Sequence, residues 1–251
     1  MGAFFAFLKE KRYFMSNELL LIGSVVLIYG TVLICYRIFG RSGMYAMTAI
    51  ATILANIEVL ILIDGFGMEQ TLGNVMFAST FLITDILSEN EGKKYASKAV
   101  WLGIFTSAVM LIFTQYWMLY TPAESDWVSG HVEAIFSTTP RLLLASFTGY
   151  IVSQRFDVWL YHRIWDATTK KSGDRQRFLW LRNNAATLIS QILNTVIFTT
   201  IAFAGWYDTK TLISIMLSSY VIYIFTSILD TPAVYIARKM KQSNKVKEEN
   251  L

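Results

Sequence analysis

The feature that most constrains the fold of this chain is a series of long apolar runs that contain almost no charged residues. Charged residues make up 16% of the 251 residues and hydrophobic residues 54%, whereas a soluble protein carries about 25% charged residues. A helix needs about 20 apolar residues to cross the hydrocarbon core of a bilayer. Seven segments meet or approach that length: 19–39, 44–63, 71–88, 99–120, 140–162, 183–206 and 211–236. They predict an all-α, polytopic membrane helix bundle of about seven transmembrane helices.

The polar segments between these runs alternate in charge, which predicts the orientation of the bundle. Lys and Arg near the ends of membrane helices stay on the cytoplasmic side. They cluster after the first, third, fifth and seventh runs, as at Arg41, Lys93 and Arg175. The alternate segments are acidic or neutral, with Lys210 as their lone basic residue. We therefore expect the C-terminus to be cytoplasmic and the N-terminus to lie outside.

The chain divides into three parts on this pattern. Residues 1–18 are interpreted as an N-terminal extension, 19–238 as the transmembrane bundle and 239–251 as a basic cytoplasmic tail. Lys9, Lys11 and Arg12 disagree with an outside N-terminus. Either residues 1–14 precede the natural start at Met15 or form an interfacial segment, or the first helix does not span. The net charge of +4 is spread over loops at helix ends, so we expect no nucleic-acid partner.

Polar side chains form a stripe along segment 183–206. Five of them recur at i, i+3, i+7, i+10 and i+11, and an aromatic ring continues the stripe; these are Asn184, Thr187, Gln191, Asn194, Thr195 and Phe198. At 100° per residue they share a face about 100° wide. Amides and hydroxyls also bond neighbouring membrane helices together. The whole stripe nevertheless favours a surface that binds a flat, neutral, hydrogen-bonding heterocycle.

Charged residues inside the apolar runs are the second group of candidates, since such residues face the bundle interior. Asp85 and Glu89 lie one helical turn apart. They could bind a cationic group, accept a transported proton, or pair with Arg155 and Arg182. Arg155 lies deep in segment 140–162, and we expect it to form a buried ion pair with Asp85 or Glu89.

Sequence motifs of common enzyme classes are absent. The chain has no Gly-x-x-x-x-Gly-Lys-Ser/Thr, no His-Glu-x-x-His and no Gly-x-Ser-x-Gly, which argues against an ATPase, a metalloprotease and a serine hydrolase. The remaining enzyme hypothesis is an intramembrane aspartyl protease that uses Asp85 and Asp230. We predict that the protein is not an enzyme and needs no metal or other cofactor.

Three of these runs carry a resemblance to a known family. They are TFLITDILSENEGKK, PRLLLASFTGYIVSQRFDVWLYHRIW and LWLRNNAATLISQILNTVIFTTIAF. They resemble the queuosine precursor transporter family, also called the vitamin uptake transporter family, from about Asn56 to Arg238. The resemblance implies a six-helix core plus one N-terminal helix in a bacterial plasma membrane. It also implies import of 7-deazaguanines such as preQ0 and preQ1 for salvage of tRNA queuosine.

The resemblance also implies where the substrate binds. The motifs of the family fall on Thr84, Asp85 and Glu89, on Arg141, Ser153, Gln154 and Asp157, and on Arg182, Asn183, Asn184 and Gln191. This chain departs from the family at Asn194, where members usually carry Asp, at Ala186 in place of Ser, and at Asn90-Glu91, where Val-Tyr is common. Losing the acid at 194 weakens any role of this stripe as a counter-charge.

We combine the stripe and the motifs into one predicted substrate site: Asn184, Thr187, Gln191, Asn194, Phe198, Asp85, Glu89, Arg155 and Gln154. A cationic aminomethyl group, as on preQ1, could meet Asp85 or Glu89. An energising ATPase module or a homodimer are the partners that the resemblance allows, and proton coupling and facilitated diffusion both stay open. The alternatives are a carrier of another purine-like or vitamin substrate, and a non-transporting scaffold or protease.

Overall fold

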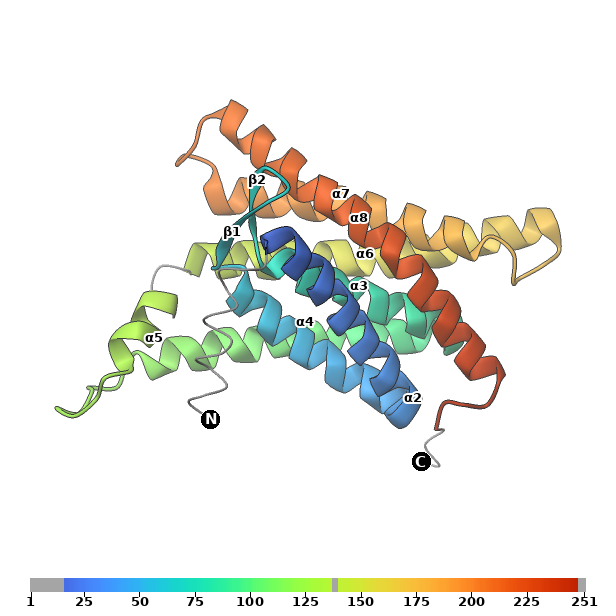
Figure 1. The fold of residues 1–251 in the computed structure, drawn as a ribbon, viewed down its shortest axis with the longest axis horizontal. Coiled ribbons are helices and arrows are strands. Elements are labelled where there is room, and N and C mark those ends of the chain that lie inside the picture. The colour runs from blue at the N-terminus through green and yellow to red at the C-terminus, as the bar shows by residue number, and fades with distance from the viewer. Residues whose placement is uncertain (1–15, 137–139, 248–251) are drawn as a thin grey trace.

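A computed structural model describes residues 16–136 and 140–247. Most of the expected N-terminal extension and residues 248–251 of the tail lie outside this range. The described chain forms a helical bundle in the order α2 (Asn17–Glu58), α3 (Gly73–Asn90), α4 (Lys93–Trp117), α5 (Ser129–Phe136), α6 (Pro140–Ser172), α7 (Leu179–Phe203) and α8 (Thr209–Gln242) (Figure 1). The prediction of an all-α membrane bundle is confirmed.

Helix α2 holds the first two predicted spans, because the chain reverses direction within it. Gly40 has φ 54° and ψ −135°, which breaks the helix into two arms, and Figure 1 shows the second arm returning beside the first. Only glycine adopts this conformation readily. A β-carbon at Gly43 would lie 2.7 Å from the carbonyl oxygen of Cys35. The two glycines therefore permit a tight turn between antiparallel arms.

A β-hairpin joins α2 to α3, where the sequence predicted only the ends of two helices. Strands β1 (Leu62–Gly65) and β2 (Met68–Thr71) pair in antiparallel register. The two turn residues, Phe66 and Gly67, both have positive φ, as a two-residue hairpin turn of type I′ requires. The hairpin contacts the start of α2, where Asn17 donates to the Asp64 carbonyl at 2.6 Å and Glu18 accepts from the Phe66 amide at 3.0 Å.

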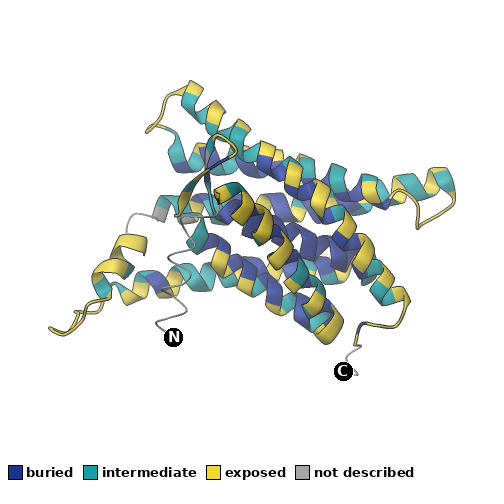
Figure 2. Ribbon diagram, viewed as in Figure 1, coloured by how far each residue is buried: buried dark blue, intermediate teal, exposed yellow. Residues whose placement is uncertain are grey.

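Helix α3 lies at the centre of the bundle. Fifteen of its 18 residues are buried, and it packs against α2, α4, α6 and α8. Figure 2 shows the buried residues in the interior and the exposed ones around the outside. Large apolar side chains such as Leu27, Phe105, Leu217 and Phe225 point outward, as lipid contact requires.

Among the described residues, four helices are long and apolar enough to cross a membrane: α2, α4, α7 and α8. The polar residues of α3 and α6 reduce their overall hydropathy. Those residues are buried between helices rather than facing outward, as at Asp85, Gln154 and Asp157. A helix wrapped by protein does not need the apolar surface of a helix in lipid.

The bundle has two distinct ends. The hairpin end carries the β-hairpin, α5 and the α7–α8 connection. The basic end carries the Gly40 turn, the α3–α4 turn, the α6–α7 connection and the C-terminal part of α8 (Figure 1). Most of the loop Lys and Arg residues noted in the sequence belong to the basic end. The basic segments of the predicted alternation therefore meet at one end of the bundle, and the acidic or neutral segments meet at the other.

Candidate functional site

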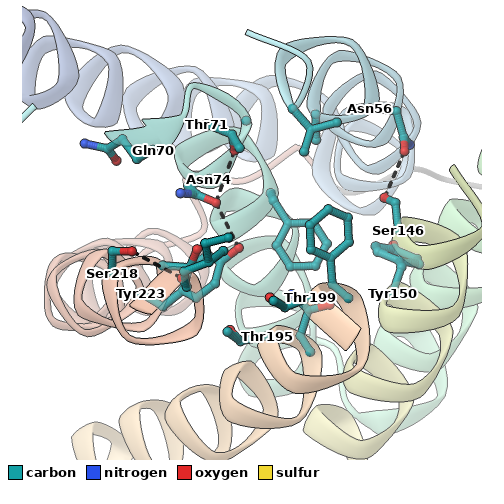
Figure 3. A pocket seen from close by; sticks show the side chains of 18 of the residues that line it. Asn56, Gln70, Thr71, Asn74, Ser146, Tyr150, Thr195, Thr199, Ser218 and Tyr223 are labelled. Atoms are coloured by element: carbon teal, nitrogen blue, oxygen red, sulfur yellow. Dashed lines mark hydrogen bonds between the residues drawn. The ribbon is translucent and has the colours of Figure 1, made fainter. Parts of the chain in front are cut away.

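A cavity of about 200 Å³ lies within the half of the bundle nearer the hairpin end. Six helices (α2, α3, α4, α6, α7 and α8) and the hairpin contribute to its wall, and Figure 3 shows part of this lining. Its polar lining includes Thr52, Asn56, Gln70, Thr71, Asn74, Thr80, Ser107, Ser146, Tyr150, Asn194, Thr195, Thr199, Ser218, Ser219 and Tyr223. No charged side chain is among the lining residues that the structure describes. The site is suited to a neutral ligand that forms hydrogen bonds.

Two asparagine side chains connect helices across the cavity wall. Asn56 of α2 accepts a hydrogen bond from the Ser146 hydroxyl of α6 at 3.0 Å. Asn74 of α3 accepts from the Tyr223 hydroxyl of α8 at 3.2 Å and from Thr71 at 3.4 Å. Figure 3 shows these bonds around the cavity. They hold the wall in place.

Other polar atoms of the wall have no hydrogen-bond partner in the described structure. They include the amide nitrogen of Asn74, both amide atoms of Gln70 and the hydroxyl of Thr195. All three residues are buried. A buried polar group without a partner costs about 1–3 kcal/mol. A polar ligand that supplied those partners would therefore gain affinity.

Aromatic rings supply the apolar part of the cavity. Phe77 lies against Tyr150 and Tyr223, with ring centroids 6.2 and 6.3 Å apart. Phe198 and Phe203 of α7 also line the cavity, in edge-to-face contact at 6.0 Å. Flat ligands bind in clefts that combine aromatic walls with a few placed polar groups. The cavity has both.

The structure divides the predicted stripe of α7 into two parts. Asn194 and Phe198 line the cavity, as does Thr195. Asn184 lies nearer the basic end and bridges to α8, because it donates to Thr231 at 2.6 Å and accepts from Ser227 at 3.2 Å. The contacts of Asn184 are therefore those of an amide that bonds two neighbouring helices together, which was the alternative to a ligand-binding role.

Gln154 and Asp85 lie between the cavity and the basic end. The Gln154 amide donates to Thr80 at 2.6 Å and accepts from Thr84 at 3.4 Å. Thr80 also lines the cavity, so Gln154 forms part of the layer beneath it. Asp85 is buried and accepts a hydrogen bond from Thr187 at 3.2 Å. Gln191 is one helical turn from Thr187 and is also buried.

Glu89 belongs to an ion-pair cluster at the basic end. Arg182 contacts both of its carboxylate oxygens, with distances of 2.6 and 2.7 Å from Nη2. The Tyr161 hydroxyl donates to Glu89 at 2.9 Å, and Arg238 approaches to 3.6 Å. Glu89 is therefore engaged by protein groups.

The prediction that Arg155 forms a buried ion pair is wrong. Arg155 is exposed, and its guanidinium lies 5.1 Å from the centre of the Trp101 ring. Its neighbour Gln154 faces the interior, and successive residues of a helix point about 100° apart. Arg182, at the start of α7, pairs with Glu89 instead.

Several wall residues were missed at the level of sequence. Gln70 and Thr71 belong to the hairpin that periodicity did not reveal, and Ser146 and Tyr150 are single polar groups in an apolar run. The i, i+4 spacing of Ser146 and Tyr150 is the one signal that could have found them.

Comparison with known proteins identifies the family. A family model described as "Putative vitamin uptake transporter" matches residues 71–237. The probable queuosine precursor transporter of Bacillus subtilis (strain 168) is 38% identical over 209 residues, which cover 83% of this chain and 89% of that protein. No solved structure matches. The matched region includes the central helix α3 and most of the cavity wall, so this chain belongs to the vitamin uptake transporter family of membrane proteins.

Proposed function

We propose that this protein imports 7-deazaguanine precursors of queuosine across a bacterial plasma membrane and binds them in the cavity near the hairpin end. The observation that carries the proposal is the cavity itself: an uncharged, aromatic and amide-lined space within a membrane bundle. The 38% identical relative is named as a probable queuosine precursor transporter, which supports this substrate class.

The shape of the cavity favours a single fused-ring base. Its volume of about 200 Å³ lies below the roughly 300–1,000 Å³ of pockets for drug-sized ligands. A 7-deazaguanine is flat and rich in hydrogen-bond groups, so its edges can pair with amides such as Asn74 and Gln70 while its faces contact aromatic rings. A nucleoside would need additional room for its ribose.

The charge distribution supports the direction of transport. Basic residues at membrane-helix ends mark the cytoplasmic side, so we infer that the basic end and the C-terminus face the cytoplasm. The cavity near the hairpin end then lies in the outer half of the bundle. Between it and the cytoplasm lie the buried layer of Gln154 and Asp85 and the Glu89–Arg182 pair. This arrangement suits a carrier ready to receive substrate from outside.

A binding measurement on purified protein tests the proposal. Thermal unfolding in detergent is followed with preQ0, preQ1, guanine, biotin or riboflavin, because a ligand that binds the native state stabilises it. We expect stabilisation by the deazaguanines and loss of labelled preQ1 uptake on deletion of the gene. Stabilisation by biotin or riboflavin alone would establish the alternative of a vitamin carrier, and no stabilisation by any of these ligands would contradict a binding site for them.

A pair of matched variants tests the location of the site. Asn194→Ala removes an amide from the cavity and should weaken deazaguanine binding by roughly 5- to 150-fold, the effect of leaving one polar group of about 1–3 kcal/mol unpaired. Asn184→Ala removes an amide of the same helix that bridges to α8, so it should lower the melting temperature and leave the dissociation constant unchanged. The reverse pattern would place the site deeper in the bundle.

A further inference from the structure

Three buried aspartates lie between the cavity and the basic end. Asp85 of α3, Asp157 of α6 and Asp230 of α8 all have 0% exposure. They are close enough to interact electrostatically: the charges of Asp157 and Asp230 both act on Asp85, and that of Asp157 acts on Asp230. We call these residues the aspartate trio. Three different helices thus bring a carboxyl group to one interior region.

No basic side chain pairs with the trio in the described part of the chain. All four ion pairs found there involve Glu89 or Glu91. Thr187 donates to one oxygen of Asp85, and the other oxygen makes no hydrogen bond of normal geometry. The same holds for both oxygens of Asp157 and of Asp230. The Ser190 hydroxyl interacts with Asp157 and the Tyr29 hydroxyl with Asp230.

The charged and titratable groups around the trio come from each helix packed against it. Tyr29 of α2, Glu89 of α3 and Tyr161 of α6 face it. Arg182 of α7 and Arg238 of α8 are directed to Glu89. The charged residues of α4, Lys93, Lys94 and Lys98, lie in its first turns at the basic end. These groups therefore do not provide the three positive charges that three ionised carboxylates would need.

Unpartnered polar groups beside the trio indicate that the region takes a ligand. Gln191 is 1% exposed, and neither atom of its amide has a hydrogen-bond partner among the described residues. It lies one turn from Thr187, on the face of α7 that contacts Asp85. Ser153 is fully buried, its hydroxyl has no hydrogen-bond partner within residues 16–136 and 140–247, and it lies one turn from Asp157 on α6. Residues four apart on a helix are neighbours, so donors and acceptors converge on the acids.

We propose that the aspartate trio is a proton-binding site that couples uptake of the substrate to proton entry. Unpaired ionised carboxyl groups are very costly in a buried region, and neighbouring acids increase that cost. Binding of protons removes the charge. A proton also needs almost no space, so it can bind to carboxyl groups that are tightly buried. The inference rests on the proposed transport function and adds its energy source.

Gln154 provides a physical connection between the trio and the cavity. Its amide contacts Thr80, which lines the cavity, and Thr84, which precedes Asp85. It also lies three residues before Asp157 on α6. A substrate that displaced Thr80 would move Gln154, and with it the surroundings of two of the three acids.

Transport by the purified full-length protein in liposomes tests the coupling. Labelled preQ0 is the probe because its nitrile side chain carries no charge. With one proton per substrate, an outside pH one unit below the inside pH should raise accumulation about tenfold, since one pH unit and a tenfold ratio correspond to the same free energy. Proton entry on addition of preQ0 should be recorded by a pH-sensitive dye inside the liposomes.

Three variants separate coupling from structure. Asp85→Asn, Asp157→Asn and Asp230→Asn each match the shape of a neutral carboxyl group. Asp157→Asn and Asp230→Asn should retain preQ0 exchange at equal pH, and at least one of the three variants should lose the tenfold effect of the pH gradient. Asp166→Asn, at an exposed position of the same helix as Asp157, should behave as the unchanged protein. If all three trio variants keep the gradient effect, the inference is overturned.

Two further measurements keep failure of coupling distinct from failure of the proposed function. The infrared band of protonated carboxyl groups, recorded without substrate, should lose intensity in the trio variants; an unchanged band would refute protonation of the trio. Binding of deazaguanines is measured separately by thermal shift, so absence of binding would refute the proposed function. Accumulation driven by a sodium gradient rather than by pH would replace the proton with Na⁺ and overturn the inference.

Discussion

The Glu89–Arg182 pair makes a quantitative prediction about stability. Both side chains are almost inaccessible, with 4% exposure for Glu89 and 0% for Arg182. Arg182 also donates to the Arg177 carbonyl at 2.7 Å, and its guanidinium lies 4.2 Å from the centre of the Trp165 ring. Removing one partner of a buried pair costs about 3–5 kcal/mol because the other charge stays buried. Arg182→Gln should therefore destabilise the protein strongly.

The remaining contacts of Glu89 set the expected size of the effect. Tyr161 still donates to it, and Arg238, at 3.6 Å, can compensate part of the charge. We therefore expect the lower end of the range, about 3 kcal/mol. For a chain of this length, that corresponds to a decrease of roughly 6–12 °C in melting temperature.

Thermal unfolding of detergent-purified variants, followed by size-exclusion chromatography of heated samples, measures this decrease. The double variant Glu89→Gln/Arg182→Gln removes both charges and should recover at least half of the loss, as a coupled pair requires. Arg177→Gln, at an exposed position of the same connection, is the control and should change stability by about 0.5 kcal/mol or less. A double variant as unstable as the sum of the single ones would refute the reasoning.

Three further predictions concern other parts of the fold. Gly73→Ala places a β-carbon 2.7 Å from the Val59 amide nitrogen, so it should lower the free energy of unfolding by about 1–3 kcal/mol in the same assay. Gly130→Ala, at a position with open space around it, is the control and should not change the stability. Gly149→Ala places a β-carbon 2.7 Å from the Asn194 side-chain oxygen, and should weaken deazaguanine binding measured by calorimetry more than it lowers the melting temperature. Hydrogen bonds from the Thr211 hydroxyl and amide lower the pKa of Asp208. The Asp208 carboxylate therefore stabilises the start of α8 fully at pH values above its unfolded-state pKa of about 3.9. This stabilisation is lost as the pH falls through the lower pKa that Asp208 has in the folded protein. Hydrogen exchange of residues 209–212, corrected for intrinsic rates, should show this step in the unchanged protein and not in Asp208→Asn.

The helices could be predicted from the sequence because lipid imposes a simple condition on them. Each spanning helix must present about 20 apolar residues, and the runs that meet this condition correspond to the arms of α2 and to α3, α4, α6, α7 and α8. The hairpin at 62–71 was missed because its strands are only four residues long. The short α5 lies in a segment too polar to resemble a span.

The cavity was harder to predict because it depends on how six helices and the hairpin meet. The stripe of α7 indicated which face of that helix is interior, and Asn194 and Phe198 do line the cavity. Periodicity does not reveal which neighbour each polar residue meets. Asn184 bonds to α8 and Glu89 to Arg182, while Arg155 turns outward. The family motifs identified Asp157 and Gln154 as notable, but only the packing of α3, α6 and α8 brings Asp157 near Asp85 and Asp230.

Helix α7 unites the two proposed sites, because its interior face extends past both. Its part nearer the hairpin end supplies Asn194, Thr195 and Phe198 to the cavity, and Thr187, two turns from Asn194, contacts Asp85. Between them lies Gln191, whose two amide atoms have no hydrogen-bond partner in the described part of the chain. A shift of α7 along its axis or a rotation about it would alter the cavity wall and the surroundings of the trio together. Such a shared element is what thermodynamic coupling between a substrate and a proton requires, since both ligands must favour the same arrangement of the protein. The position of Gln191 midway along this face makes it the residue whose contacts should differ most between the substrate-free and substrate-bound states.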